Sequence, residues 1–202
     1  MKITRSRKSH ISDWWWTIDK VQLGSIVLLI IFGIVLNLAA SPPIAEKLSL
    51  NQYYFVKRQF LFFILGILVM FFFSFLNLKN LRRLCLIIFI TSLITIFFLN
   101  IFGTPIKGAT RWLDLGIISV QPSEFAKPTF IVLISWFLSE SIVKTVPSKI
   151  ISLMLYSLFA FGLILQPDIG QTLLVVFSWA VLIFTSGINI YFLLAIFLLG
   201  TF

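Results

Sequence analysis

The sequence is poor in the residues that many enzymes use for catalysis and for binding metals. Its 202 residues include one cysteine, Cys85, and one histidine, His10. A single cysteine excludes an internal disulfide and a cysteine-based metal site. Because His10 lies in a basic N-terminal stretch, a histidine-dependent catalytic triad or zinc site is not expected.

Charged residues are scarce as well, at 11%, whereas hydrophobic residues make up 59% and phenylalanine alone occurs 23 times. A soluble globular domain is only about 45–50% apolar, so the composition predicts an integral membrane protein. The net charge of +9, from 16 basic and 7 acidic residues, suits anionic lipid head groups or an anionic substrate. Nucleic-acid binding is not expected, because the basic residues are dispersed among loops between apolar runs.

Long apolar runs predict an all-α polytopic membrane protein, a bundle of six complete transmembrane helices plus the start of a seventh. A run of about 20 residues is enough to cross the hydrocarbon core of a bilayer. The predicted spans are 21–40, 55–76, 84–102, 122–138, 150–165 and 169–186, and residues 188–202 open the seventh. The double proline Pro42-Pro43 is expected to break the first helix, and the basic stretch 77–83 is expected to form a turn.

The basic and aromatic residues 1–20 are expected to form a cytoplasmic tail ahead of a transmembrane domain of residues 21–202. Trp14-Trp15-Trp16 fits rings that lie at the level of the lipid head groups. No apolar core with a small-residue cleavage site precedes the first span, so a cleaved signal peptide is not indicated. With the N-terminus inside, ten basic residues fall on the cytoplasmic side and six outside, which favours a cytoplasmic N-terminus.

One long polar stretch, residues 103–127, interrupts the apolar sequence. It holds five of the chain's 23 charges (16 basic plus 7 acidic), two prolines and three glycines, a density that predicts loops and tight turns. Pro122 suits the first position of a helix, so a helix is expected to begin at 121–123. Pro128 is expected to kink that helix near its start.

Four ionisable residues, Arg111, Glu124, Lys127 and Asp168, are expected at the outer ends of the spans. Charges at membrane depth are costly, so such groups usually pair or line a cavity. By spacing alone, Glu124 and Lys127 fit either a cavity role or an exposed ion pair worth about 0.2–0.5 kcal/mol. Asp168 fits a helix N-cap or a cavity role. Trp112 fits an interface ring or a flat surface for the face of a sugar.

Three segments of this sequence resemble a known family. They are Lys107-Gly-Ala-Thr-Arg-Trp-Leu-Asp-Leu-Gly116, Gln121-Pro-Ser-Glu-Phe-Ala-Lys127 and Gln166-Pro-Asp-Ile-Gly-Gln-Thr172. Together they closely resemble the signature of the SEDS family, the FtsW and RodA proteins of bacterial cell-wall growth. The tryptophan run before the first span and the Gly-Gln-Thr segment are more similar to FtsW of alphaproteobacteria.

The resemblance implies a multi-pass enzyme of the bacterial inner membrane, a glycosyltransferase that polymerises lipid II into peptidoglycan at the division septum. It also implies a class B penicillin-binding protein and other divisome proteins as partners, and a divalent cation, Mg²⁺ or Mn²⁺, as cofactor. The family's catalytic base is an aspartate in an outer loop after the seventh span. That position is expected beyond Phe202, so the catalytic residue is unassigned and residues 1–202 alone are expected to be inactive. A lipid II flippase and a non-enzymatic divisome scaffold stay open as alternatives.

The resemblance also suggests roles for single residues. Arg111 and Lys127 are expected to hold the pyrophosphate of the lipid, while Glu124 and Asp168 orient the cavity or a divalent cation. Gln121, Ser123 and Trp112 belong to the same cavity motif by position. Arg58, one turn into the second span, is expected either to reach the membrane interface or to turn inward toward an anionic head group.

Overall fold

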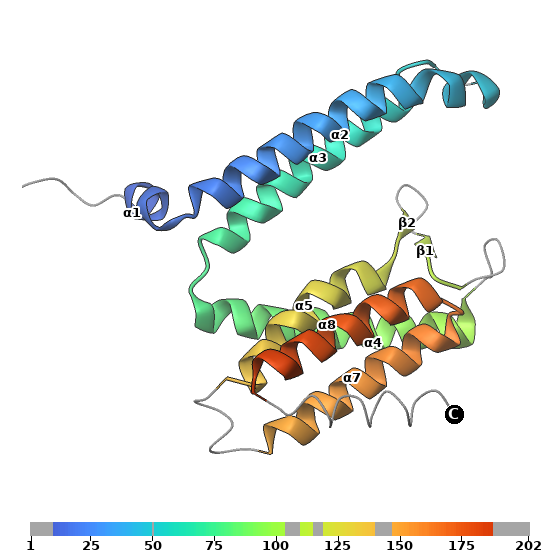
Figure 1. Ribbon diagram of the computed structural model, residues 1–202. Coiled ribbons are helices and arrows are strands. Elements are labelled where there is room, and N and C mark those ends of the chain that lie inside the picture. Colours follow the sequence, from blue (N-terminus) through green and yellow to red (C-terminus); the bar gives the residue numbers. More distant parts are fainter. Residues whose placement is uncertain (1–9, 50, 104–109, 115–118, 140–146, 188–202) are drawn as a thin grey trace, which may run out of the picture. The chain divides into compact units, whose positions relative to one another are not determined.

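The computed structural model describes residues 10–49, 51–103, 110–114, 119–139 and 147–187 (Figure 1). Contacts within the chain group it into two compact units, residues 1–77 and 78–202. Among these described residues, helices dominate both units, and a pair of two-residue strands occurs in the second. The predicted boundary after residue 20, the tail 1–9 and the seventh apolar run 188–202 are not tested, because the tail and the last run lie outside the described residues.

The first unit contains the short helix α1 (His10–Thr17) and a hairpin of two long helices, α2 (Lys20–Lys47) and α3 (Tyr54–Ser74). The carboxylate of Asp19 begins α2 by accepting hydrogen bonds from the backbone N–H groups of Val21 (2.8 Å) and Gln22 (3.1 Å). Such a side-chain cap satisfies donors that have no partner in the first turn of a helix.

The expectation that Pro42-Pro43 breaks the first helix is wrong. The helix α2 continues through both prolines to Lys47, so the connection to α3 is much shorter than the sequence indicated. A proline removes one helical N–H but its fixed φ of about −65° is itself helical, so two adjacent prolines near a helix end need not terminate it. The hydroxyl of Ser41 donates a hydrogen bond to the carbonyl oxygen of Gln52 (3.1 Å), which fastens this end of the hairpin.

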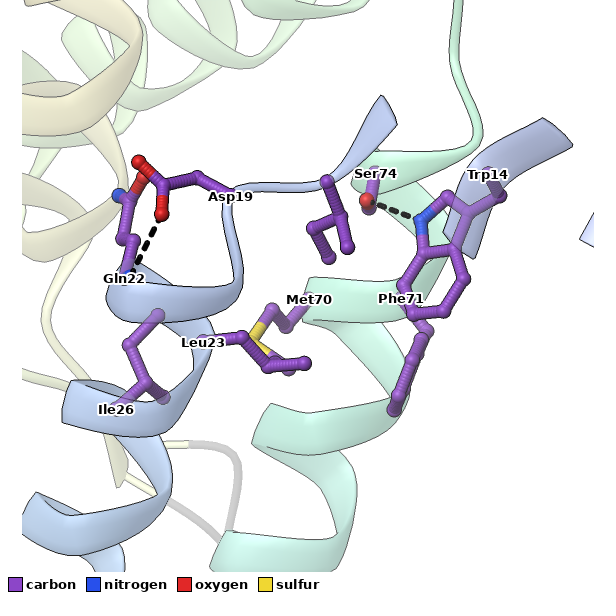
Figure 2. A pocket seen from close by; sticks show the side chains of 9 residues that line it. Trp14, Asp19, Gln22, Leu23, Ile26, Met70, Phe71 and Ser74 are labelled. Atoms are coloured by element: carbon purple, nitrogen blue, oxygen red, sulfur yellow. Dashed lines mark hydrogen bonds between the residues drawn. The ribbon is translucent and has the colours of Figure 1, made fainter. Parts of the chain in front are cut away.

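Trp14 joins α1 to the C-terminal end of α3 (Figure 2). Its indole N–H donates to the Ser74 hydroxyl at 2.6 Å, and its ring centroid lies 5.3 Å from those of both Phe71 and Phe75. Beside it, side chains of α1, α2 and α3 line a largely apolar cavity of about 180 Å³. The tryptophan run therefore includes one ring packed on the protein, whereas Trp16 is 76% exposed, as expected for a ring in a lipid interface.

The described part of the second unit is a bundle of four helices: α4 (Leu78–Phe102), α5 (Pro122–Phe137), α7 (Ser148–Leu165) and α8 (Ile169–Thr185) (Figure 1). Its core forms where the helices turn apolar faces toward one another, with Cys85, Phe89, Leu93 and Ile96 of α4 at helical spacing. Phe89 contacts Phe130 of α5 and Phe159 of α7, with ring centroids 6.0 Å and 5.7 Å apart.

Two polar contacts fasten helices inside this bundle. The indole N–H of Trp179 in α8 donates to the Ser152 hydroxyl of α7 at 2.9 Å, and both side chains are buried. The amide of Asn100 in α4 donates to the carbonyl oxygen of Gly162 in α7 at 3.1 Å. Interhelical hydrogen bonds of this kind stabilise membrane helices by about 0.6–2 kcal/mol each.

One local expectation for this unit is wrong. Residues 77–83 do not form a turn, because α4 already begins at Leu78. Leu78, Leu81 and Leu84 recur at helical spacing, and lysine and arginine are good helix formers, so the basic residues continue the helix. Within the polar stretch 103–127, where loops and tight turns were predicted, the structure also has an antiparallel pair of strands, β1 (Leu113–Asp114) and β2 (Ser119–Val120). Strands of two residues are too short to show an alternating pattern in the sequence.

Among the residues that the structure describes, four helices are long and apolar enough to cross a membrane, namely α2, α3, α4 and α7. The helix α8 is apolar but has 17 residues, and α5 has 16. The start of α5 at Pro122 confirms the predicted helix beginning at 121–123, and α5 continues through Pro128. The kink expected there stays a prediction.

Candidate functional site

The four ionisable residues singled out in the second unit lie at one end of its bundle. At this end α4 and α7 finish and α5 and α8 begin, because consecutive helices of the bundle run in opposite directions (Figure 1). Arg111 lies just before β1, Glu124 and Lys127 lie in the first turns of α5, and Asp168 precedes α8. Residues from three separate stretches of sequence thus meet around the turn between α7 and α8.

Arg111 is the residue that ties the loop to that turn. Its Nη1 lies 3.4 Å from Oδ2 of Asp168. Its Nε and Nη2 donate to the carbonyl oxygens of Gln166 (3.2 Å) and Pro167 (2.8 Å). A guanidinium has five N–H donors in a fixed fork, so these three contacts leave donors for a further anion.

Gln166 also links this turn to the loop, through its side chain. Its side-chain amide donates to the carbonyl oxygen of Thr110 at 3.1 Å, and the residue is 1% exposed. Hydrogen bonds therefore run both ways between the two segments: Arg111 of the loop donates to the turn between α7 and α8, and Gln166 of that turn donates to the loop. Gln166 was not among the predicted site residues, although it opens one of the segments that carry the family resemblance.

Asp168 fills one of the two roles that its sequence position allowed, and its cavity role stays a prediction. It is the N-cap of α8, with Oδ1 accepting a long hydrogen bond (3.4 Å) from the backbone N–H of Gln171. Its other oxygen faces Arg111, and its side chain is only 9% exposed. A buried carboxylate needs such a cation, because an unpaired charge at this depth is costly.

Glu124 and Lys127 form the i,i+3 ion pair that their spacing allowed, with Lys127 Nζ 2.8 Å from Glu124 Oε1. Lys127 also donates to Oε1 of Gln171 in α8 at 2.5 Å, and the Gln171 amide donates to Glu124 Oε1 at 3.1 Å. The pair is therefore part of a closed triangle between α5 and α8. Gln171 was not predicted, and only its place in the Gly-Gln-Thr segment pointed to it.

The charges of these four residues balance, and Glu124 is the most exposed of them. Two cations face two carboxylates, and the side chains of Lys127 and Glu124 are 15% and 50% exposed. Lys127 has three ammonium donors, of which the described contacts use two. The cluster can thus receive an anionic group through Arg111 and Lys127 while the two carboxylates set the position of both cations.

Three residues of the cavity motif are placed differently from one another. Ser123 is 1% exposed, and its hydroxyl has no hydrogen-bond partner among the described residues. Gln121 occupies the N-cap position of α5 without a side-chain cap bond. Trp112 is 43% exposed next to Arg111, which fits an interface ring and a sugar-stacking surface equally well.

Arg58 belongs to α3 in the first unit, so its position relative to this cluster is not defined. Its guanidinium lies 5.8 Å from the ring centroid of Phe62, one helical turn further along. A cation over an aromatic face gains some electrostatic attraction even when exposed. Whether Arg58 reaches the interface or turns toward a head group stays a prediction.

The divalent cation expected from the family resemblance stays a prediction. No group of three or more histidine, cysteine, aspartate or glutamate side chains lies together among the residues that the structure describes. Mg²⁺ and Mn²⁺ prefer near-octahedral oxygen ligands. Asp168 and Glu124 offer carboxylates, but each already faces a cation of the protein.

Comparison with known proteins places the chain in a family. Residues 20–202 match the FtsW/RodA/SpoVE family, described as cell cycle proteins. The chain belongs to this family. The resemblance inferred from the sequence segments is thereby confirmed, and with apolar helices of spanning length the protein is a multi-pass membrane protein.

Curated relatives carry the name "probable peptidoglycan glycosyltransferase FtsW". The FtsW of Caulobacter vibrioides is 34% identical over 188 residues, which span 92% of this chain and 48% of the relative. The FtsW of Wigglesworthia glossinidia is 30% identical over 191 residues, 90% of this chain and 49% of the relative. The chain thus spans about half the length of the curated relatives that it matches.

Solved structures of the family have the same fold. The crystal structure of the rod shape determining protein RodA of Thermus thermophilus matches with a TM-score of 0.72 and 27% identity, over 92% of this chain and 60% of RodA. A chain of a peptidoglycan synthase complex, studied for how it coordinates polymerization and crosslinking, matches with a TM-score of 0.62 and 27% identity, over 84% of this chain and 52% of that chain.

Proposed function

We propose that the complete protein is a peptidoglycan glycosyltransferase of cell division, which polymerises lipid II into glycan strands. The observation that carries this proposal is the similarity to relatives named FtsW, at 34% and 30% identity over nearly the whole chain. The charged cluster at one end of the second unit supports it, because a lipid-linked pyrophosphate needs cations at head-group depth.

In this proposal the described residues bind and position the lipid. Arg111 and Lys127 contact the pyrophosphate with the donors that their present contacts leave over, and Asp168 and Glu124 keep both cations in place. The reaction joins a sugar hydroxyl to the anomeric carbon of a second lipid-linked sugar, and the pyrophosphate leaves with its lipid. A base must take the hydroxyl proton. We place that base, an aspartate by family resemblance, outside residues 1–202.

A divalent cation, Mg²⁺ or Mn²⁺, stays part of the proposal on family resemblance. Bound near the pyrophosphate, it would neutralise charge on the leaving group. Asp168 and Glu124 are the described residues that could contribute oxygen ligands, and the other ligands would have to come from the lipid or from residues outside the described part.

We further propose six complete spans and the start of a seventh, with the N-terminus in the cytoplasm and residues 1–20 as an interfacial tail. The excess of basic residues on the proposed inner side supports this orientation. The charged end of the second unit then faces outward. From the resemblance to FtsW we also propose that the protein lies in the inner membrane at the septum. Its proposed partners are a class B penicillin-binding protein and other divisome proteins. The structural similarity to a chain of a peptidoglycan synthase complex supports such a partner.

The test is a glycan-polymerisation assay with fluorescent lipid II and the complete gene product in detergent micelles, visualised as a ladder of strands on a gel. We expect strands from the wild type and a loss of at least tenfold for Glu124→Ala and Asp168→Ala, with Lys149→Ala, at the opposite end of α7, as a matched control. Strand formation that is unaffected in both carboxylate variants would contradict the assignment of this site.

The same variants separate the two alternative functions. A flippase would move lipid II across proteoliposome membranes and leave it unpolymerised. A scaffold would support division of depleted cells even when both carboxylates are alanine, provided that the variant still inserts into the membrane. A wild-type protein that gives transport without strands, or complementation by the double variant, would replace the proposed activity.

A further inference from the structure

Gln171 makes three hydrogen bonds at the charged end of the second unit. Its side-chain Oε1 accepts from the Lys127 ammonium at 2.5 Å, and its side-chain Nε2 donates to Glu124 Oε1 at 3.1 Å. Its backbone N–H is the donor that Asp168 caps at 3.4 Å. One residue therefore contacts members of both ion pairs.

The chemistry of an amide suits this place. A glutamine presents an acceptor and a donor at the end of one side chain, so it can bond a cation and an anion at the same time without adding charge. Methionine has nearly the same length and offers neither group. Glutamate keeps the acceptor for Lys127 but, when ionised, sets a second carboxylate against Glu124.

The position of Gln171 also joins two helices. Glu124 and Lys127 lie in the first turns of α5, whereas Gln171 lies in the first turn of α8, and these helices pack against each other. Within α5 the Glu124–Lys127 pair has the freedom of two long side chains, of which Glu124 is 50% exposed. An exposed i,i+3 pair holds its geometry only weakly. The bridge to α8 supplies the constraint that α5 alone lacks.

We propose that Gln171 is a positioning residue, which holds the Lys127 ammonium and the Glu124 carboxylate in register with the Arg111–Asp168 pair. This inference rests on the proposed function of that cluster. Gln171 acts through its neighbours and does not itself contact the lipid. Misplacement of a binding group by about 1 Å can lower a rate by up to about 100-fold, so a neutral bridge of this kind can matter for activity without carrying chemistry.

The experiment compares Gln171→Met and Gln171→Glu with the wild type in the complete gene product, with Gln52→Met, at an exposed position between α2 and α3, as the matched control. Initial rates of strand formation are measured against lipid II concentration between pH 5.5 and 8.5, and thermal unfolding of each variant is recorded. Glu124→Gln is included in the same series.

For Gln171→Met we expect a fall of about tenfold in kcat, with an unfolding temperature close to that of the wild type. For Gln171→Glu we expect activity near the wild-type value at low pH, where one proton shared by the two carboxyls keeps the bridge, and a progressive loss as the pH rises and both ionise. A role in folding alone would not produce this pH dependence.

Three outcomes would overturn the inference: a Gln171→Met activity within twofold of the wild type, a loss of activity that follows the loss of folded protein, or a ratio of Gln171→Glu to wild-type activity that is constant with pH. Failure of the proposed function looks different. In that case Glu124→Gln is as active as the wild type, or the wild type forms no strands at any pH.

Discussion

The contact between Arg111 and Asp168 allows a quantitative prediction about the stability of the second unit. At 3.4 Å and an effective dielectric constant of about 20, two unit charges attract each other by about 5 kcal/mol. Screening lowers this value, because the Arg111 side chain is 31% exposed, and desolvation of Asp168 lowers it further. We therefore expect a net coupling of about 1–2 kcal/mol between the two side chains.

A double-mutant cycle with Arg111→Met and Asp168→Asn measures this coupling. Arg111→Met removes the bonds to two carbonyl oxygens and leaves a carboxylate that is only 9% exposed without its cation, so we expect a loss of about 2–3 kcal/mol. Asp168→Asn keeps an oxygen that can cap α8 and should cost about 1–2 kcal/mol. The double variant should lose about 1–2 kcal/mol less than the sum of the two.

The free energy of unfolding is measured by reversible unfolding in mixed micelles of detergent and sodium dodecyl sulfate. Lys149→Met combined with Asp168→Asn is the control, because Lys149 lies near the opposite end of α7, about 25–30 Å away along the helix. We expect the control pair to be additive within about 0.5 kcal/mol. A coupling below that value for Arg111 and Asp168 would refute the idea that this ion pair fastens the loop to the turn.

Three further predictions concern the scaffold and are checked by thermal unfolding. Gly162→Ala should destabilise the protein by about 1–3 kcal/mol, because the added Cβ would lie 3.0 Å from Ile96 Cγ2. Gly24→Ala is the control and should be neutral or stabilising, because nothing lies within 4 Å of its added Cβ. Equal effects of the two substitutions would contradict the prediction. Trp179→Phe should lower the free energy of unfolding by about 1 kcal/mol, because the Ser152 hydroxyl loses the hydrogen bond that it accepts from the indole N–H. Adding Ser152→Ala to Trp179→Phe should change the free energy of unfolding little further. Pro43→Ala should raise the unfolding temperature, because α2 is helical through Pro43 and regains one N–H donor. A lower unfolding temperature would contradict this prediction.

Much of the helical architecture could be predicted from the sequence because membrane spans are long and apolar. The start of α5 was also predictable, since Pro122 at the first helical position is a local signal. The two errors at 42–43 and 77–83 have one cause: breaker and charge signals were given more weight than the helical continuity that surrounds them. A proline near a helix end and a basic stretch with leucines every third residue can both be helical.

The charged residues of the site could be predicted individually, but their pairing could not. The Glu124–Lys127 pair follows from i,i+3 spacing within one helix. The Arg111–Asp168 pair and the contacts of Gln171 join positions 44 to 57 residues apart, and no local pattern encodes them. The sequence alone does not indicate a role for an uncharged glutamine, and the contacts of Gln171 follow only from the packing of α5 against α8.

The sequence separation of these partners has a consequence for biosynthesis. Arg111 leaves the ribosome 57 residues before Asp168, and at about 5–20 residues per second this corresponds to about 3–11 s. Lys127 has Glu124 beside it from the moment that α5 forms, whereas the guanidinium has no acidic counterpart among its described contacts until the turn before α8 has been made. During insertion, the Arg111 side chain therefore lacks Asp168 as a partner until the turn before α8 has been made.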